Sequence, residues 1–247
     1  MFKTFIKFWK RNFLLNYHFL FSFIFIIVGI YWVFFGIAKA DAFEWGFDAT
    51  WFSLGFLHSC AIKTDWSGVC WGLNTDWQSN FPSGTNYKYV SAWTYHSCAI
   101  KTDWSGVCWG KNDYWQSNFP TGTNYKYLSV GSGHSCAIKT DWSGVCWGKN
   151  DYWQSNFPSG TNYKYLSVGS AHSCAIKTDW SGVCWGSTWE WQANFPSGTN
   201  YKYVSAWYRH SCAIKTDWSG VCWGDTFPTG TNYKYVSAWT YHSCAIK

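Results

Sequence analysis

Strand-forming and turn-forming residues alternate with a fixed period along most of the chain. The clearest phrase, His96–Gly110, places two strand-like runs, 97–101 and 106–109, on either side of the polar segment 102–105. Two such runs around a short polar turn predict a β-hairpin. The phrase begins at His58, His96, His134, His172, His210 and His242, so that successive starts are 38, 38, 38, 38 and 32 residues apart. A period of this length predicts a solenoid, an array or a propeller.

Each hairpin is preceded by a further predicted strand. In the segment 87–92, alternation places Tyr87 and Tyr89 on one face and Val90 on the other. A Pro-Ser-Gly-Thr-Asn turn comes before it, and a fourth extended segment at Gln78–Phe81 would complete a small sheet. No helical period follows residue 41. The pattern predicts an all-β fold, a β-propeller of repeated ~38-residue blades after an N-terminal hydrophobic segment, with a β-solenoid as the structural alternative.

The repeats set the predicted domain boundaries. Residues 53–57 align with 91–95, so the propeller repeats are predicted over 53–247, and 41–52 are predicted to be a lead-in. The fifth copy passes from Gly224 through Asp225 and Thr226 to Phe227, skipping six residues that its neighbours have. The sixth copy stops at Lys247, before its hairpin turn. We interpret this as an incomplete ring or fragment; ring closure by the last strand is the alternative.

Residues 1–40 have the layout of an export signal. A basic start from Lys3 to Arg11 precedes a charge-free run from Phe19 to Ala38, and Ala38-Lys39-Ala40 is a small-x-small site. This pattern is typical of a signal peptide cut after Ala40. The apolar run is also long enough to span a bilayer, so an uncleaved membrane anchor is the alternative. Both interpretations place 41–247 outside the cytoplasmic membrane, secreted or on the cell surface.

Charge gives no reason to expect a nucleic-acid partner. The formal net charge is +6, but residues 1–40 hold five basic residues and no acidic one. The remainder carries 14 basic and 13 acidic residues, whereas nucleic-acid binding needs a basic patch. Contact with a membrane is therefore expected only through the N-terminal segment, if it is uncleaved.

Two cysteines occur in each of the first five hairpins. The candidate disulfides join Cys60 with Cys70, Cys98 with Cys108, Cys136 with Cys146, Cys174 with Cys184, and Cys212 with Cys222. A three-residue loop at 64–66 would place Cys60 opposite Cys70, at a Cα separation of roughly 4.5 Å. A two-residue turn would instead point the two sulfurs to opposite faces. Export favours the disulfides. The alternative is a zinc set of His58, Cys60 and Cys70, although this spacing matches no standard zinc motif.

Catalysis is not expected. Ser97 follows His96 on a strand, so the two side chains point to opposite faces, and both belong to the repeat itself. Neither the deletion after Gly224 nor the segment 188–191 brings together a nucleophile and a base. We therefore predict no catalytic residues, no metal and no cofactor, and we expect each repeat histidine to hydrogen-bond a neighbouring backbone at a blade edge.

The unit resembles the repeat of the regulator of chromosome condensation family, including its bacterial extracellular relatives. The third copy carries the matching residues Gly131, His134, Ser135, Ala137, Ile138, Asp141, Val145, Trp147, Gly148, Asn150 and Gln154. The resemblance covers about residues 53–247. It implies a propeller, usually seven-bladed, that serves mainly as a binding platform. A guanine-nucleotide exchange role is not carried over, because an exported domain would not meet a small GTPase.

Tryptophan stands at several positions where the family has glycine. The turn column holds Trp66, Trp104, Trp142, Trp180 and Trp218, and the column before Gln holds Trp77, Trp115, Trp153 and Trp191. The column before the histidine mixes Gly55, Gly131 and Gly169 with Trp93, Trp207 and Trp239. Since one packed position rarely accepts both residues, we hypothesise that UGA codons read here as tryptophan encode glycine. A genuine aromatic ladder for sugars is the alternative. Trp71, Trp109, Trp147, Trp185 and Trp223 lie in the family's own tryptophan column.

Together these features predict a non-enzymatic, exported or cell-surface propeller, stabilised by disulfides within its repeats, that binds an unknown protein or glycan partner. The second hypothesis is a carbohydrate-binding or adhesive surface protein that uses aromatic platforms. A secreted hydrolase is disfavoured, because no acid or nucleophile cluster stands outside the repeat. Near-identical repeats favour multivalent binding of a repeated ligand.

Overall fold

The computed structural model describes residues 49–224, 232–238 and 243–246. The predictions for residues 1–40, for the shortened segment after Gly224 and for Trp239 fall outside these ranges. The chain divides into two units, 1–39 and 40–247, and every described strand belongs to the second. Within the described ranges there is no helix with the length and apolar character needed to cross a membrane.

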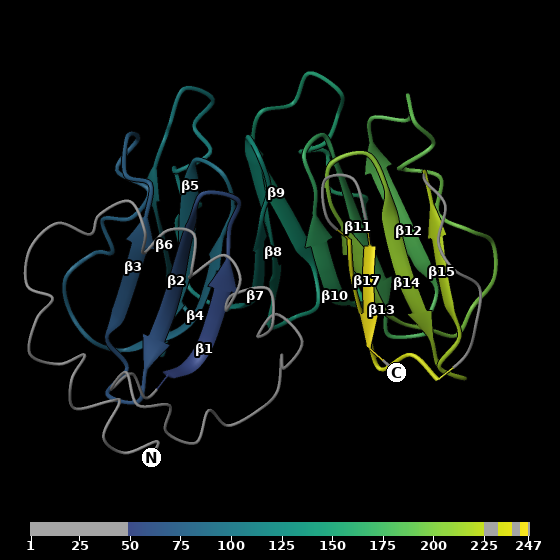
Figure 1. Ribbon diagram of the computed structural model, residues 1–247, viewed down its shortest axis with the longest axis horizontal. Helices are drawn as coiled ribbons and strands as arrows, with labels where there is room; N and C mark the ends of the chain where they lie inside the picture. The colour runs from purple at the N-terminus through teal and green to yellow at the C-terminus, as the bar shows by residue number, and fades with distance from the viewer. Residues whose placement is uncertain (1–48, 225–231, 239–242, 247) are drawn as a thin grey trace, which may run out of the picture. The chain divides into compact units, whose positions relative to one another are not determined.

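The described chain is built of short antiparallel sheets in chain order (Figure 1). Five sheets have three strands and the last has two. The strands are β1 Ala49–Leu54, β2 His58–Lys63, β3 Gly68–Gly72; β4 Tyr87–Ala92, β5 His96–Lys101, β6 Gly106–Gly110; β7 Tyr125–Val130, β8 His134–Lys139, β9 Gly144–Gly148; β10 Tyr163–Val168, β11 His172–Lys177, β12 Gly182–Gly186; β13 Tyr201–Ala206, β14 Ser211–Lys215, β15 Gly220–Trp223; β16 Tyr235–Ala238, β17 Ser243–Ile246. The all-β prediction is confirmed.

Two details of the predicted blade are wrong. The first sheet begins at Ala49, inside the segment predicted as lead-in, and β1 pairs with β2 in the register in which β4 pairs with β5. The predicted fourth strand at Gln78–Phe81 is a loop of successive turns. There the side chain of Asn74 accepts from the backbone N–H of Ser79 at 2.9 Å, which satisfies the local backbone without a strand partner.

A three-residue loop closes each complete hairpin. In the first, the backbone N–H of Lys63 donates to the carbonyl of Ser67 at 2.8 Å, and that of Trp66 donates to Lys63 at 3.0 Å. The third loop residue, Trp66, has a φ of 64°. A type I turn followed by one left-handed residue is the usual three-residue hairpin connection. Asp65 supports the turn, since its Oδ1 accepts from the hydroxyl and the backbone N–H of Ser67.

This turn places the two cysteines of every complete hairpin directly opposite each other, with Cα–Cα separations of 4.0–4.1 Å. Disulfides join all five predicted pairs: Cys60 with Cys70, Cys98 with Cys108, Cys136 with Cys146, Cys174 with Cys184, and Cys212 with Cys222. The three-residue alternative is therefore confirmed and the two-residue turn is excluded. Each disulfide bonds two strands of the same sheet, so it fixes the register of that hairpin.

The two sulfurs of each disulfide lie at different depths. The first cysteine of every pair is 0% exposed and belongs to the core between sheets. The second cysteine is only partly buried, and this holds for Cys70, Cys108, Cys146, Cys184 and Cys222. Cys184 and Cys222 lie against the apolar clusters without being enclosed by them. Each disulfide thus ties the outermost strand of a sheet to the buried middle strand.

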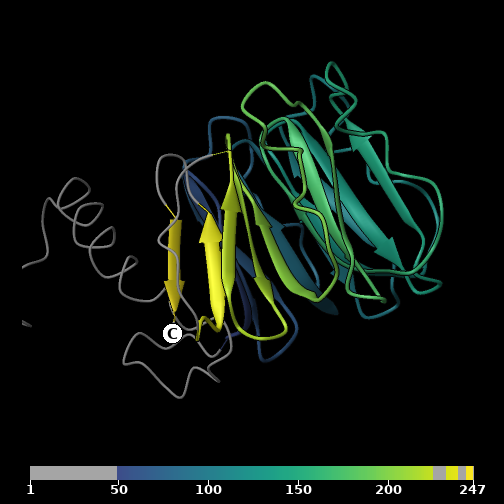
Figure 2. The same cartoon turned by 90° about the vertical axis from the view of Figure 1, so that its right-hand side faces the viewer.

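The core lies between successive sheets rather than within any one of them. Cys60 and Ile62 of the first sheet pack against Tyr87 and Val90 of the second, and all four are at most 2% exposed. The same positions recur between the other neighbouring sheets. The first strand of each sheet contacts that of the next, and Figures 1 and 2 show neighbouring sheets packed side by side. This is blade packing of the propeller type, in which a sheet buries its faces only against its neighbours.

A buried histidine links each of the first four sheets to the following one. His96 Nε2 lies 2.7 Å from Ser135 Oγ, and the other pairs are His58–Ser97, His134–Ser173 and His172–Ser211, at 2.6–2.8 Å. The expectation that these histidines bond a neighbouring backbone is therefore wrong, because the partner is a serine hydroxyl. Desolvation by burial lowers the pKa of His58 to about 4 and that of His96, His134 and His172 to about 3.

These histidines predict acid destabilisation. An unfolded histidine has a pKa near 6.5, so between about pH 6.5 and pH 3 the unfolded chain binds more protons. The contribution of the neutral histidines to the free energy of unfolding is complete above pH 6.5 and is lost as the pH falls. At pH 5 the loss is about 1–2 kcal/mol for each buried histidine. Urea unfolding at pH 7.5 and pH 5.0 should show this loss, and His134→Gln should reduce it. Equal midpoints at the two pH values would contradict the assignment.

The disulfides predict a stability cost on removal. Cys136→Ser with Cys146→Ser opens a loop with a sequence separation of 10. We expect the free energy of unfolding to fall by about 2–4 kcal/mol, because the unfolded chain is no longer restrained. The measurement is urea unfolding under oxidising conditions. Reductant should lower the midpoint of the parent protein further than that of the variant. A parent midpoint that does not respond to reductant would show that these bonds contribute nothing.

Candidate functional site

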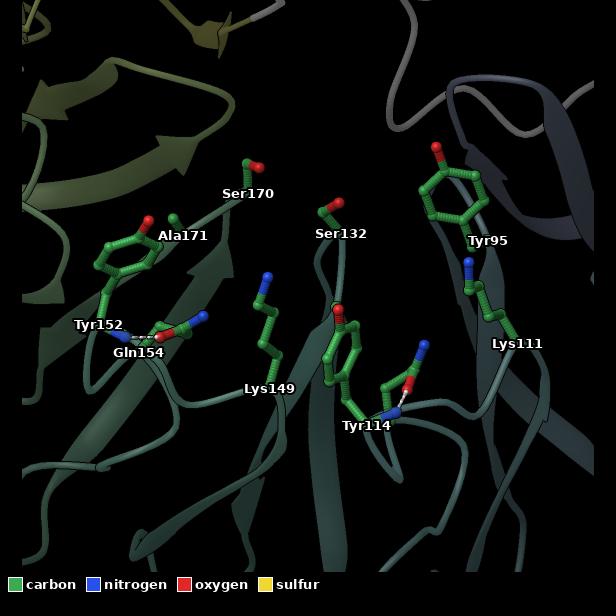
Figure 3. Close-up of a pocket in the computed structure, with 11 residues that line it drawn as sticks. Tyr95, Lys111, Tyr114, Ser132, Lys149, Tyr152, Gln154, Ser170 and Ala171 are labelled. Atoms are coloured by element: carbon green, nitrogen blue, oxygen red, sulfur yellow. Dashed lines mark hydrogen bonds between the residues drawn. The ribbon is translucent and has the colours of Figure 1, made fainter.

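One cleft of about 320 Å³ opens across three neighbouring sheets. It lies between the turns that precede β5, β8 and β11 and the loops that follow β6 and β9 (Figure 3). Its lining is polar and aromatic: Tyr95, Lys111, Tyr114, Gln116, Ser132, Gly133, Lys149, Tyr152, Gln154, Ser170 and Ala171.

Tyrosines and lysines alternate along this cleft. Lys111 Nζ lies 5.1 Å from the ring centre of Tyr95, and Lys149 Nζ lies 4.9 Å from that of Tyr114. Figure 3 shows Lys149 between Tyr152 and Tyr114. Contacts of this geometry hold an ammonium group against an aromatic face. The cleft therefore presents ring faces and ammonium groups side by side.

Each cleft lysine also has an acidic neighbour. Lys111 Nζ lies 3.2 Å from Asp113 Oδ2, and Lys149 Nζ lies 3.2 Å from Asp151 Oδ2. The hydrogen bond that the Lys111 ammonium donates to Asp113 raises the pKa of Lys111. Burial acts to lower the pKa of Lys149, but the hydrogen bond and charge of Asp151 outweigh it and the pKa is raised. Both lysines are cations at neutral pH, and their charge is locally balanced.

A buried glutamine positions each central tyrosine. Gln116 Oε1 accepts from the backbone N–H of Tyr114 at 2.8 Å, and Gln154 does the same for Tyr152. Both glutamines are 1% exposed. The carbonyl of Gln116 also accepts from Trp147 Nε1 at 3.0 Å, which ties this loop to the next sheet. The cleft tyrosines thus stand on loops anchored in the packing between sheets.

The sequence contains a signal for this cleft that our predictions missed. Only the second and third copies carry the loop Lys-Asn-Asp-Tyr, at 111–114 and 149–152. The first copy has Leu-Asn-Thr-Asp at 73–76, and the fourth has Ser-Thr-Trp-Glu at 187–190. Where near-identical repeats differ at one position, the shared fold does not require a particular residue at that position.

The candidate zinc set is not assembled. Cys60 and Cys70 are bonded to each other, and His58 directs Nε2 to Ser97. Within the described residues no three His, Cys, Asp or Glu side chains gather in a way that could hold a metal ion. The histidine–serine pairs have the spacing of a base and a nucleophile, but His96 and Ser135 are both 0% exposed, so substrate cannot reach them.

Two columns of tryptophan differ sharply in their surroundings. Four tryptophans, Trp109, Trp147, Trp185 and Trp223, donate Nε1 to a glutamine carbonyl in the preceding repeat at 2.8–3.0 Å. The column before that glutamine is instead among the most exposed in the chain. Trp77, Trp115, Trp153 and Trp191 are 69–72% exposed.

No family model matches this chain, and no curated protein matches it. Solved propeller structures do. The ectodomain of the Physcomitrella patens receptor kinase CR4 aligns over 81% of this chain with a TM-score of 0.70 and 23% identity. The ectodomain of the Arabidopsis thaliana receptor kinase ACR4 aligns over 81% with a TM-score of 0.69 and 26% identity, and 77% of that chain is covered. This chain spans 59% of the length of the moss ectodomain.

A third structure is Prp20 of Saccharomyces cerevisiae, the yeast RCC1. It aligns over 81% of this chain and 69% of its own, with a TM-score of 0.66 and 16% identity. At these identities the likeness establishes the fold. The described part of the chain is a β-propeller built of five three-stranded sheets and one two-stranded sheet.

Replacing the cleft acids should cost less stability than replacing the anchoring tryptophan. Asp113→Asn with Asp151→Asn removes two exposed ion pairs, which are worth less than about 1 kcal/mol each. Trp147→Phe removes the hydrogen bond to the Gln116 carbonyl, and we expect it to cost about 1–3 kcal/mol. Urea unfolding of the two variants measures the difference. If the aspartate variant loses as much stability as Trp147→Phe, the acids are structural rather than part of an open site.

Proposed function

We propose that this chain is an exported or cell-surface propeller that binds a partner and does not catalyse a reaction. Its five disulfides support the location, because structural disulfides persist in oxidising compartments and are rare in reducing ones. Export would follow from the N-terminal segment 1–40, either as a cleaved signal peptide or as an anchor.

The observation that carries the binding function is the cleft spanning three sheets. Its distinguishing residues, Lys111, Tyr114, Lys149 and Tyr152, occupy positions where the repeats differ from one another. Concave sites with a few convergent polar groups are the usual places where proteins bind ligands. The partner is a protein or a glycan that meets this face.

A glycan is the specific alternative that the cleft chemistry favours. Tyr95, Tyr114 and Tyr152 offer ring faces, and Ser132 and Ser170 offer hydroxyl groups. The ion pairs of Lys111 and Lys149 supply both donors and acceptors. This mixture suits a hydroxyl-rich chain with neutral or mixed charge.

The repeat supports membership of the regulator of chromosome condensation family. The residues that carry the resemblance now have structural roles: His134 links two sheets, Trp147 binds the Gln116 carbonyl, and Gln154 anchors a loop. Yeast Prp20 binds Gsp1p and histones. We do not extend those partners to this chain, since our proposal places it outside the cytoplasm.

The test of location is the redox state in the native cell. Rapid alkylation of intact cells, followed by mass spectrometry, should find the five cysteine pairs oxidised. A membrane-impermeant protease should digest the protein without lysis. Reduced thiols in a protected compartment would overturn the proposal.

The test of binding compares two matched lysine pairs. The oxidised protein is applied to a panel of neutral and acidic glycans and to its own cell surface before and after protease treatment. Lys111→Ser with Lys149→Ser should weaken binding at least about tenfold, which is the loss of one or two good contacts. Lys126→Ser with Lys164→Ser, on exposed strand positions outside the cleft, should leave it unchanged. Equal affinities for the two variants would exclude the cleft, and protease-sensitive binding without glycan binding would identify a protein partner.

A further inference from the structure

We infer that the tryptophans at left-handed backbone positions, together with Trp93 and Trp207, are glycines in the protein as its own cell makes it. A gene whose UGA codons are read as glycine by that cell, and as tryptophan in the present sequence, would produce this pattern. The inference stands on backbone geometry and goes beyond the proposed function, because it decides which side chains the binding surface possesses.

The turn column gives the first observation. Trp66, Trp104, Trp142, Trp180 and Trp218 have φ between 64° and 66°. Each is the last residue of a three-residue hairpin loop, the position that glycine normally occupies. A side chain with a Cβ is strained there, since the Cβ approaches the following carbonyl oxygen. If these residues were tryptophan in the native protein, one domain would contain five strained turns, each with the largest side chain at the strained position.

The column before the glutamine gives the second observation. Trp77, Trp115, Trp153 and Trp191 have φ between 59° and 65°. Their indoles are 69–72% exposed, so little packing offsets the backbone strain.

Positive φ distinguishes the tryptophans of the turn column and of the column before the glutamine from those that bind a glutamine carbonyl. In the described residues, every other positive-φ position is held by asparagine or glycine, the two residues that tolerate this conformation best. None of the tryptophans whose Nε1 reaches a glutamine carbonyl has a positive φ. Those indoles pack between repeats, and we expect them to be tryptophan in the native protein. Their column is therefore the control for the columns assigned to glycine.

The column before the histidine adds a steric observation. A Cβ on Gly131 would lie 2.2 Å from the carbonyl oxygen of Gly169, and one on Gly169 would lie 2.2 Å from that of Trp207. In those repeats the N–H of Ser132 and of Ser170 donates to the next repeat, at 3.4 and 2.8 Å. The equivalent bond from Thr94, which follows Trp93, does not form within the described residues.

Trp93 and Trp207 also disturb their own turns. Their N–H groups reach the carbonyls of His96 and His210 at 3.3 and 3.2 Å, whereas Gly131 and Gly169 reach their histidines at 2.8 and 2.9 Å. The two indoles crowd each other, with ring centres 3.6 Å apart, while aromatic pairs normally keep 4.5–7 Å. Glycine at both positions would restore the contact that Gly131 and Gly169 make.

In the turn column, one interaction opposes the inference. The ammonium of Lys88 lies 3.8 Å from the ring centre of Trp104, and three later repeats have the same contact. A cation on a ring that stays partly exposed to solvent is worth less than the left-handed conformation costs. The contact also has no counterpart in the column of Trp115.

The functional consequence concerns the binding surface. With glycine in these columns, the exposed indole ladder of Trp77, Trp115, Trp153 and Trp191 does not exist, and it cannot be a sugar platform. The tyrosines and lysines of the cleft lie outside the affected columns. They remain as the aromatic and charged surface of that face.

The decisive experiment is peptide mass spectrometry of protein purified from its native source. After reduction, trypsin releases the peptide 102–111, which holds both Trp104 and the control Trp109, and then 112–126, which holds Trp115. We expect 102–111 to be lighter by one tryptophan-to-glycine difference, at position 104 and not at 109, and 112–126 to be lighter at 115. Tryptophan at 104 and 115 would overturn the inference.

A second measurement uses two synthetic genes for the full chain. One encodes the sequence as given, and the other encodes glycine at the eleven positions. The glycine protein should unfold at least several degrees higher, because strain is released at many independent sites. Trp109→Gly with Trp147→Gly is the control and should lower the unfolding temperature. A tryptophan protein that folds with an equal or higher unfolding temperature would contradict the inference. Neither measurement depends on ligand binding, so its outcome is separate from that of the cleft experiment.

Discussion

The hairpin turn at 64–66 and its equivalents is the constraint on which the rest of the structure depends. Its left-handed third residue brings Lys63 opposite Ser67, and from that pairing the register of the whole hairpin follows. Cys60 then meets Cys70, and Ile62 and Cys60 turn toward the next sheet. A one-residue change in the loop would reverse every side chain on the strand, separate the sulfurs and expose the core face. The turn needs a residue that accepts φ near 64°. This one local requirement controls both the formation of the disulfides and the packing of the apolar core.

The second level of order lies between the sheets. The histidine–serine pairs and the tryptophan–glutamine bonds all join one repeat to the next, as do the apolar layers around Tyr87 and Tyr163. A single three-stranded sheet could not bury these groups alone. The glutamine loops show how this order supports function, because the residue that anchors a loop in the interior also holds a cleft tyrosine in place.

Much of this architecture was predictable from the repeat. The period, the alternation in 87–92 and the spacing of Cys60 and Cys70 led to the propeller and its disulfides. The partners of the histidines were not predictable, because Ser135 lies 39 residues from His96 and only the stacking of sheets brings them together. The first strand was predicted to begin too late, since position by position Ala49–Leu54 matches Tyr87–Ala92 only at Ser53. The cleft depends on three sheets at once, yet its variable lysines and tyrosines were visible in the loops. Their significance emerged only when the fold showed that 111–114 and 149–152 line one cleft.

A glycine-like turn sets the hairpin register and, through that register, the disulfides and the packing of the blades. A high-resolution crystal structure of the protein purified from its own organism tests this claim most directly. We predict no side-chain density at 104 or 142, a left-handed backbone at both, and continuous density between Cys98 and Cys108. Indole density at 104 with a right-handed backbone and separate thiols would contradict the claim.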